Sequence, residues 1–205
     1  MHIRASVILV TWNSFSYLAK CLDCLVAQTN KEFEVFIIDN GSTNNDFLEI
    51  EEKYSGLNLS VKRLEKNTGF SIANNIGAHH ARGKYLILLN ADAFPEPDWL
   101  QNLLAAAQLF PNSFFSSRQI QANRSDLLDG EGDIYHVSGL AWRKDYNLPV
   151  YPLDEFREVF SACGAAALYP RQEFLNAGGF DEDYFSYHED VDLGFRLRLR
   201  GLTCM

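Results

Sequence analysis

The sequence has few cysteines, no long apolar run and a shortage of positive charge, and each deficit excludes a class of protein. Four cysteines in 205 residues are too few for the disulfide framework of a small secreted scaffold. The longest uncharged apolar runs, residues 7–10 and 85–89, are far shorter than the roughly 20 residues of a membrane-spanning helix. Lys and Arg number 18 against 27 Asp and Glu, which is a net charge of −9, so we expect no binding to nucleic acid.

Two kinds of short signal are also missing. No apolar segment with a small-residue cleavage site opens the chain, so we expect no secretory signal and a cytoplasmic location, with peripheral association at the inner face of the membrane left open. No G-x-G-x-x-G follows a strand, and the stretch from Gly77 to Gly83-Lys84-Tyr85 departs from the P-loop in its glycine spacing and in the Tyr after Lys. Kinase-type and classical dinucleotide-binding functions are therefore not favoured.

The first half of the chain alternates short apolar runs with longer mixed segments. With 47% hydrophobic and 22% charged residues, the composition is that of a globular protein of one or two domains. The alternation predicts β-α-β units around a mostly parallel central sheet flanked by helices, an α/β fold. The predicted strands are residues 3–11, 35–38, 59–64, 84–89 and 113–118, and the predicted helices are 14–28, 45–54, 71–82 and a segment from 95 to 109.

The second half is less regular. Residues 119–157 lose clear periodicity, and we predict an irregular excursion there because long unpatterned segments in compact domains are usually functional loops. Residues 159–169, rich in small side chains, predict another strand. In residues 191–199 apolar side chains alternate strictly with polar or small ones, which is typical of a strand, whereas a helix would have to be buried on two sides.

Acidic and amide side chains follow two of the predicted strands. Asp39 comes after the second strand, and Asn90-Ala91-Asp92 comes after the fourth. Ligands of open α/β sheets bind beyond the carboxyl ends of the strands, and a carboxylate at such an end can hold a hard divalent cation together with substrate phosphates. The alternative is that Asp39 forms a turn or caps a helix and that Asp92 caps the helix after Pro95.

A third acidic group lies near the end of the chain, in residues 181–183 and 189–192. A solvated loop followed by a helix start would account for the charge. It would not account for Tyr184, Phe185 and Tyr187 among the acids, because aromatic neighbours desolvate a carboxylate and raise its pKa toward the range useful for a general base.

Several motifs follow one another in a fixed order along most of the chain. They are residues 6–13 (SVILVTWN), 28–29 (QT), 38–42 (IDNGS), 67–70 (NTGF), 74–77 (NNIG), 89–92 (LNAD), 163–166 (CGAA), 178–185 (GGFDEDYF) and 189–194 (EDVDLG). In this order they resemble the family 2 inverting glycosyltransferases of the GT-A fold, in particular the bacterial rhamnosyltransferase-like branch that assembles surface polysaccharides.

The resemblance implies a donor site of one nucleoside-diphosphate sugar and one divalent cation. Asn90 occupies the first position of the family's D-x-D motif, where most members have Asp. The last position, Asp92, would then be the main ligand of Mg²⁺ or Mn²⁺. The residues implied to line the nucleotide and sugar are Thr11, Asn13, Asp39 (to the base), Asn67, Gly69, Asn74 and Asn90.

The resemblance also implies the catalytic residues of a metal-dependent inverting hexosyltransferase. Asp190 would be the general base that takes a proton from the acceptor hydroxyl, and Glu189 would orient the acceptor or the base. Inversion needs no covalent intermediate, so the two-carboxylate rules for hydrolases do not apply. The family places this pair at the start of a helix, which favours a helix over residues 189–199 against the alternation.

The expected organisation is one catalytic domain over residues 1–205. Residues 1–118 would bind the nucleotide sugar, and residues 119–205 would bind the acceptor, with the C-terminal part expected to be incomplete because relatives usually continue further. We expect dTDP-rhamnose or a UDP-sugar as donor and a saccharide or lipid-linked saccharide as acceptor. The alternatives are a non-catalytic domain that binds nucleotide or glycan, which Asn90 favours and the intact Glu189-Asp190 pair opposes, and a sugar nucleotidyltransferase, for which the glycine-rich basic loop is missing after the first strand.

Overall fold

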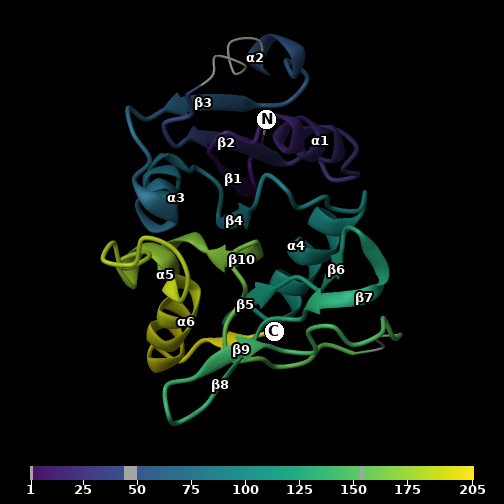
Figure 1. Cartoon of the computed structure of the whole chain (residues 1–205), viewed down its shortest axis with the longest axis vertical. Helices are drawn as coiled ribbons and strands as arrows, with labels where there is room; N and C mark the ends of the chain where they lie inside the picture. The colour runs from purple at the N-terminus through teal and green to yellow at the C-terminus, as the bar shows by residue number, and fades with distance from the viewer. Residues whose placement is uncertain (1, 44–49, 153–154) are drawn as a thin grey trace.

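The computed structural model describes residues 2–43, 50–152 and 155–205. Its centre is a seven-stranded sheet with the order β11-β5-β10-β4-β1-β2-β3, and helices cover both faces of that sheet (Figure 1). The predicted α/β fold with a mainly parallel sheet is confirmed. The sheet and its helices are β1 (Ala5–Thr11), α1 (Phe15–Val26), β2 (Phe33–Asp39), α2 (Ile50–Lys53), β3 (Leu59–Arg63), α3 (Gly69–His80), β4 (Tyr85–Leu89), α4 (Trp99–Leu109), β5 (Ser113–Ser116), β10 (Ala166–Pro170), α5 (Arg171–Asn176), α6 (Glu189–Leu199) and β11 (Thr203–Cys204).

The central strands divide their side chains between two cores. Strand β1 pairs in parallel with β2 and with β4, and successive side chains of a strand point to opposite faces. Val7 and Leu9 therefore pack with α1 and α4 on one face, while Ile8 packs with α3, α5 and α6 on the other. Burial on both faces explains why β1 and β4 are continuous apolar runs rather than alternating ones.

Strand β10 runs against its neighbours. It pairs antiparallel with β4, with Ala166 opposite Leu89, and antiparallel with β5. Because of this direction, the start of β10 lies beside the end of β4. The predicted strand over residues 159–169 was too long, since residues 159–165 cross this end of the sheet as irregular chain with short bridges.

The excursion over residues 119–157 is more regular than predicted. It contains β6 (Gln119–Gln121) paired with β7 (Arg124–Gly130), and β8 (Asp133–Tyr135) paired with β9 (Ala141–Arg143). Strands β6, β8 and β9 have only three residues each, which is too short for a period-two pattern to show in the sequence. The β8–β9 hairpin projects at the bottom of the molecule, beside the end of α6 (Figure 1).

Residues 189–199 form a helix, α6, as the family resemblance implied and the alternation did not. Leu193 and Leu197 are fully buried, whereas Leu199 is 75% exposed and Phe195 is 43% exposed. The helix therefore does not bury two sides, and the alternation comes from apolar side chains left on its open face. Within the described residues no helix combines the length and the apolar character needed to cross a membrane. The predicted helix over 45–54 lies partly outside the described residues, and its described part is α2.

Candidate active site

A cleft of about 440 Å³ opens at the carboxyl ends of β1 and β4, where the sequence placed the ligand site. Its volume is within the range of small-molecule sites. Five of the lining residues belong to the predicted set, namely Thr11, Asn67, Gly69, Asn90 and Asp92. The others are Val10, Trp12, Ser14, Tyr17, Asn40, Phe70, Ala91, Phe185 and Ser186.

Asn40 holds one wall of the cleft together. Its Nδ2 donates to Asn67 Oδ1 and to the carbonyl of Gly69, each at 3.0 Å. Its Oδ1 accepts from the backbone N–H of Thr68 at 2.9 Å and from the Thr68 hydroxyl at 3.0 Å. One buried amide side chain thus ties the loop after β2 to the first turn of α3, and the sequence analysis did not single it out.

Gly69 starts α3 in a conformation that requires glycine. Its φ is +86°, and a Cβ there would lie 2.5 Å from the carbonyl oxygen of Phe185. The backbone N–H of Phe70 donates to the same carbonyl at 2.7 Å. The predicted site residue Gly69 therefore allows residues 185–186 to close one side of the cleft.

Asp39 and Asn13 lie beside the cleft rather than on its lining. Asp39 is fully buried; it accepts from the backbone N–H of Ser42 at 3.0 Å and forms an ion pair with Arg63 at 3.1 Å between Oδ2 and Nε. Asn13 has a φ of +51°, and its Oδ1 accepts from the backbone N–H of Thr43 at 3.0 Å. In this structure both side chains accept hydrogen bonds from the backbone of residues 42–43 and so stabilise the loop beside the cleft.

Asn74 lies one helical turn below the cleft. It is 1% exposed, and its Nδ2 donates to the carbonyl of Phe70 at 3.0 Å. The structure therefore places Asn74 behind the lining formed by Phe70, not on the surface of the cleft.

The end of β4 offers oxygen ligands to a cation. Asp92 is exposed and Asn90 half-buried on the lining. At the end of the neighbouring strand β1, Thr11 Oγ1 is buried and has no hydrogen-bond partner among the described residues. Within the described residues no three His, Cys, Asp or Glu side chains converge as a metal cage. One carboxylate with a neighbouring amide fits a Mg²⁺ or Mn²⁺ ion that takes its other ligands from water and substrate phosphates.

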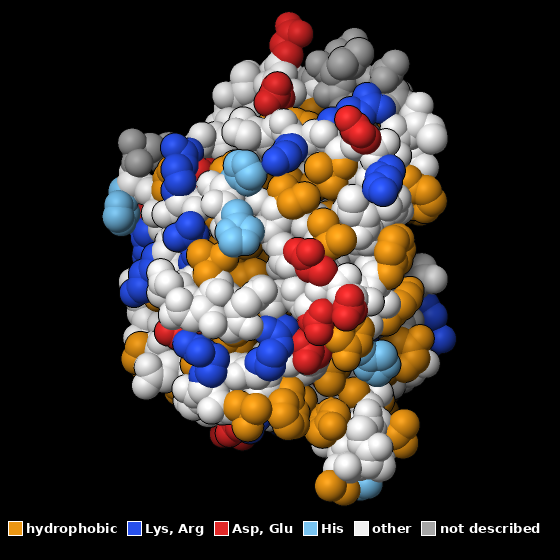
Figure 2. All heavy atoms as spheres, turned by 90° about the vertical axis from the view of Figure 1, so that its left-hand side faces the viewer, with side chains coloured by type: hydrophobic (Ala, Val, Ile, Leu, Met, Phe, Trp, Pro, Cys, Tyr) orange, Lys and Arg blue, Asp and Glu red, His pale blue; other side chains and the backbone are white. Residues whose placement is uncertain are grey.

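Glu189 and Asp190 are the first two residues of α6, and they directly follow two residues with strained backbone. Tyr187 and His188 have φ values of +73° and +68°, a conformation that costs a non-glycine residue about 1 kcal/mol or more. Burial of the carboxyl raises the pKa of Glu189 from 4.5 to about 7, and the negative charge of Asp190 adds to the increase. The acidic residues 181–183 are instead exposed, and Figure 2 shows acidic side chains on the surface of the face that carries α3 and α5.

Two hydrogen bonds connect Asp190, the predicted general base, to the end of β4 beside the cleft. The backbone N–H of Asn90 donates to the carbonyl of Ala165 at 2.9 Å, and the backbone N–H of Gly164 donates to Asp190 Oδ2 at 3.0 Å. The irregular segment before β10 therefore contacts the end of β4 on one side and the start of α6 on the other. Asp190 and Glu189 do not line the cleft itself.

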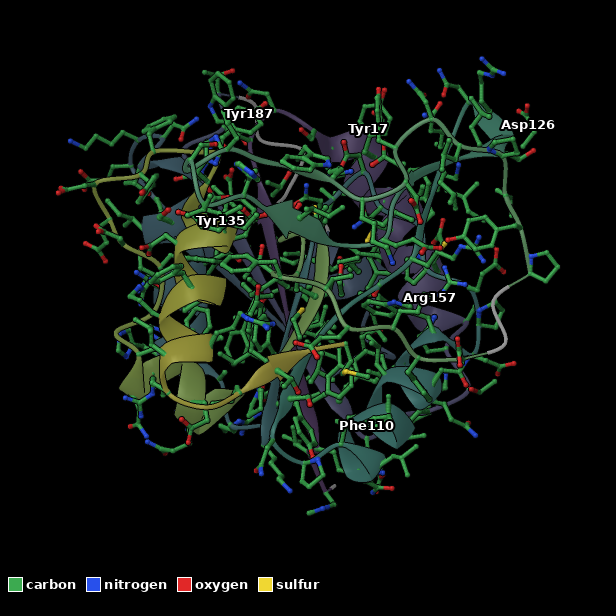
Figure 3. All side chains as sticks on the ribbon, turned by 90° about the horizontal axis from the view of Figure 1, so that it is seen from below. Tyr17, Phe110, Asp126, Tyr135, Arg157 and Tyr187 are labelled. Atoms are coloured by element: carbon green, nitrogen blue, oxygen red, sulfur yellow. The ribbon has the colours of Figure 1, made fainter. Side chains whose placement is uncertain are left out.

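Four of the nine lining residues outside the predicted set are aromatic, namely Trp12, Tyr17, Phe70 and Phe185. Trp12 is 52% exposed and Tyr17 is 55% exposed on the cleft, and the rings of Tyr17 and Tyr187 point outward along one edge of the molecule (Figure 3). Trp12 lies between the predicted site residues Thr11 and Asn13, so the sequence did contain a signal for its place in the cleft. The sequence contained no such signal for Tyr17, because the helical spacing of α1 identifies only the side chains that face the core.

A family model and two relatives show which known proteins the chain is similar to. The model of the family described as glycosyl transferase family 2 matches residues 6–175. The O-antigen biosynthesis protein RfbC of Myxococcus xanthus is 28% identical over 97% of this chain, and the hyaluronan synthase of Pasteurella multocida is 35% identical over 96% of it. The chain spans 16% and 23% of the lengths of these two relatives.

Solved structures support the same fold. GalNAc-T7 with UDP, GalNAc and Mn²⁺ aligns with 99% of this chain and 42% of its own, at a TM-score of 0.78 and 19% identity. Residues 1–349 of Staphylococcus aureus TarS with UDP-GlcNAc align with 99% of this chain and 56% of their own, at a TM-score of 0.71 and 21% identity. The expected GT-A fold is confirmed.

Proposed function

The chain belongs to glycosyl transferase family 2, and we propose that it is an inverting glycosyltransferase that moves a sugar from a nucleoside-diphosphate sugar to a hydroxyl of a saccharide. The observation that carries the proposal is the pair of hydrogen bonds that joins Asn90 through Ala165 and Gly164 to Asp190. These bonds fix a carboxylate suited to general-base work next to a cleft of nucleotide-sugar size.

The cleft side supplies donor binding. A divalent cation held by Asp92 and Asn90 would neutralise the charge that develops on the departing diphosphate. Thr11 Oγ1, which is buried and has no hydrogen-bond partner in the part of the chain that the structure describes, is available to hydrogen-bond the donor. The exposed rings of Trp12 and Tyr17 provide flat apolar surface for a base or sugar. Asp39, which the family resemblance assigns to the base, is buried and paired with Arg63 in this structure.

The α6 side supplies acceptor activation. Asp190 takes the proton of the acceptor hydroxyl as that oxygen bonds to the anomeric carbon and the bond to the diphosphate oxygen breaks. A single displacement inverts the configuration at that carbon. The hydrogen bond from Gly164 to Asp190 Oδ2 holds the carboxylate in place during the step.

The donor we propose is dTDP-rhamnose or a UDP-sugar, and the acceptor is a saccharide or a lipid-linked saccharide of a bacterial surface polysaccharide. The relatives named for O-antigen biosynthesis and hyaluronan synthesis support a role in polysaccharide assembly. UDP in one similar structure and UDP-GlcNAc in another support a nucleoside-diphosphate donor. We place the reaction in the cytoplasm or at the inner face of the membrane.

The first test is thermal stability with UDP, dTDP, GDP and ADP, each with and without Mn²⁺. A ligand at about 100 times its dissociation constant adds about 2.7 kcal/mol of stability, which raises Tm by several degrees. We expect a metal-dependent increase with one pyrimidine diphosphate. Asp92→Asn should abolish the metal dependence, whereas Asp98→Asn, an exposed acid at the start of α4, should keep it. Absence of any increase would contradict the donor site.

Transfer is then measured with the sugar nucleotides of the diphosphate that binds. Asp190→Asn should abolish transfer and leave nucleotide binding largely intact. Equal transfer by this variant would exclude Asp190 as the base. Binding without transfer by the unchanged protein, over a broad acceptor panel, would favour the non-catalytic alternative.

A further inference from the structure

Asn75, in the middle of α3, bonds to a segment that is distant in the sequence. It is 7% exposed. Its Oδ1 accepts from the backbone N–H of Phe180 at 2.9 Å, and its Nδ2 donates to the Phe180 carbonyl at 2.9 Å and to Glu182 Oε1 at 3.2 Å. One carboxamide therefore pairs with both backbone groups of Phe180, as a residue of a neighbouring β-strand would.

Two adjacent glycines precede Phe180, and they differ in what surrounds them. Both have a positive φ, +90° at Gly178 and +71° at Gly179. A Cβ at Gly179 would lie 2.5 Å from Asn75 Oδ1, whereas a Cβ at Gly178 would meet nothing within 4 Å. Gly179 therefore leaves the room that the Asn75 carboxamide occupies, and Gly178 serves the turn alone.

The chain that follows Phe180 is exposed but is bonded to α3 a second time. Residues 181–188 are exposed, and in Figure 1 the chain between α5 and α6 loops out just below α3. The carbonyl of Phe185 accepts from the backbone N–H of Phe70, in the first turn of α3, at 2.7 Å. Asn75 and Phe70 therefore hold the two ends of residues 180–185 on one helix.

This segment forms part of the cleft. Phe185 and Ser186 line the cleft, and so does Phe70. Phe180 is 1% exposed, and its ring centroid lies 5.8 Å from that of Phe70. A shift of Phe180 away from Asn75 would therefore disturb both the packing of Phe70 and the position of this wall of the cleft.

The start of α6 is supported independently of Asn75. The backbone N–H of Gly164 donates to Asp190 Oδ2 at 3.0 Å, and Leu193 and Leu197 are fully buried in the core. Loss of the Asn75 contacts should therefore loosen the wall of the cleft more than it displaces the proposed base.

We propose that Asn75 is a positioning residue for donor binding, because it fixes residues 180–186 on α3 as one wall of the cleft. This inference deepens the proposed function and rests on it for the identity of the bound nucleotide. A loosened wall should weaken donor binding and raise the donor KM, while kcat changes less because Asp190 keeps its own support. A residue that served stability alone would lower the amount of folded enzyme, and so the apparent kcat, without changing KM.

The first test needs no ligand and measures native-state hydrogen exchange at the Phe70 amide, whose acceptor is the Phe185 carbonyl. In Asn75→Ala this amide should exchange about tenfold faster, because the closed segment loses the net stabilisation of the Asn75 hydrogen bonds. The control is Glu34→Gln, which weakens a buried contact with Arg82 at the other end of β2. This control should leave the exchange of the Phe70 amide unchanged.

The second test measures donor KM and kcat with the sugar nucleotide that supports transfer, together with the affinity for its diphosphate. Asn75→Ala should raise the donor KM and weaken diphosphate binding by about tenfold, with a change in kcat of less than about threefold. Gly179→Ala should do the same from the other side of the contact, since its Cβ displaces the Asn75 carboxamide. Gly178→Ala is the matched control, because it carries the same kind of backbone strain without that contact.

The proposal is overturned if the Phe70 amide exchanges at the same rate in Asn75→Ala and Glu34→Gln, or if kcat falls in Asn75→Ala while the donor KM stays unchanged. Should Asn75→Ala fail to fold, the comparison of Gly179→Ala with Gly178→Ala decides both measurements. If the unchanged protein binds no nucleotide, the proposed function fails, and the exchange comparison still decides whether Asn75 holds the segment.

Discussion

Replacing Asp133 with Asn should make the stability of the protein depend less on pH. Burial raises the pKa of Asp133 in the folded state from 3.8 to about 7, and the negative charge of Asp190 adds to the increase. The folded protein therefore holds a proton that the unfolded chain releases, and this contribution to stability is complete below about pH 4 and is lost as the pH rises through about 7. The Asn side chain does not titrate and can still accept, through its own oxygen, the hydrogen bond that Asp133 accepts from the Ser161 hydroxyl at 2.8 Å.

The size of this pH-dependent contribution to stability follows from the interval between the unfolded and folded pKa values of Asp133. Between pH 5 and the folded pKa of about 7, the unfolded Asp is ionised while the folded one still holds its proton. Each unit of that interval corresponds to about 1.4 kcal/mol. Because the Ser161 hydrogen bond and Arg143 oppose the increase in this pKa, we expect about 1 to 3 kcal/mol of stability to depend on Asp133 between pH 5 and pH 8.

The assay is urea unfolding at pH 5 and pH 8, followed by fluorescence of the three tryptophans. The stability difference between Asp133→Asn and the unchanged protein should favour the variant more at pH 8 than at pH 5 by that amount. Any fixed cost of the carboxamide cancels in this comparison. Asp126→Asn, which replaces an exposed acid of β7, should follow the unchanged protein at both pH values, and parallel behaviour of Asp133→Asn would refute the buried, protonated carboxyl.

Three further substitutions test the architecture of the site and its support. Gly69→Ala, with its φ of +86° and a Cβ 2.5 Å from the Phe185 carbonyl oxygen, should lower the free energy of unfolding by about 1 to 3 kcal/mol and weaken the Tm increase produced by nucleotide. Glu34→Gln removes the buried carboxylate that Arg82 contacts through Nε at 2.8 Å, and should cost about 1 to 3 kcal/mol in urea unfolding, with little effect on nucleotide binding. Gly194→Ala should overpack the contact between α6 and the segment before β10, at a cost of about 1 to 3 kcal/mol, and should lower transfer more than nucleotide affinity.

Several residues of the cleft could be predicted from the sequence because their signals are local. Buried parallel strands are apolar on both faces, so β1 and β4 stand out as runs, and the side chains that follow them fall at the ligand edge without any knowledge of packing. Thr11, Asn90 and Asp92 were found in this way or through the family motifs, and the structure brings them onto one cleft. Asp39 was found by the same argument but is buried against Arg63.

The surroundings of α6 and of Asn40 could not be predicted in this way, because they depend on contacts between residues that are distant in the sequence. Strand β10 is too short to reveal its direction, and that direction places Gly164 near Asp190. Asp133 stands in a three-residue strand with no pattern of its own, and its burial against Ser161 appears only in the folded chain. Asn40 was adjacent to a predicted residue, but the four hydrogen bonds of its side chain go to the Asn67–Gly69 segment, which is distant in the sequence and which no local rule identifies.

The reversed direction of β10 also governs how the site is assembled in time. Asn90 and Asp190 are a hundred positions apart in the chain, yet only Ala165 and Gly164 separate them along the path of hydrogen bonds. A ribosome would have to release residues up to Asp190 before this path could close, so the end of β4 is synthesised long before its connection to α6 can form. In native-state hydrogen exchange the amides of Asn90 and Gly164 should therefore open together, because either bond breaks when the segment before β10 leaves its place.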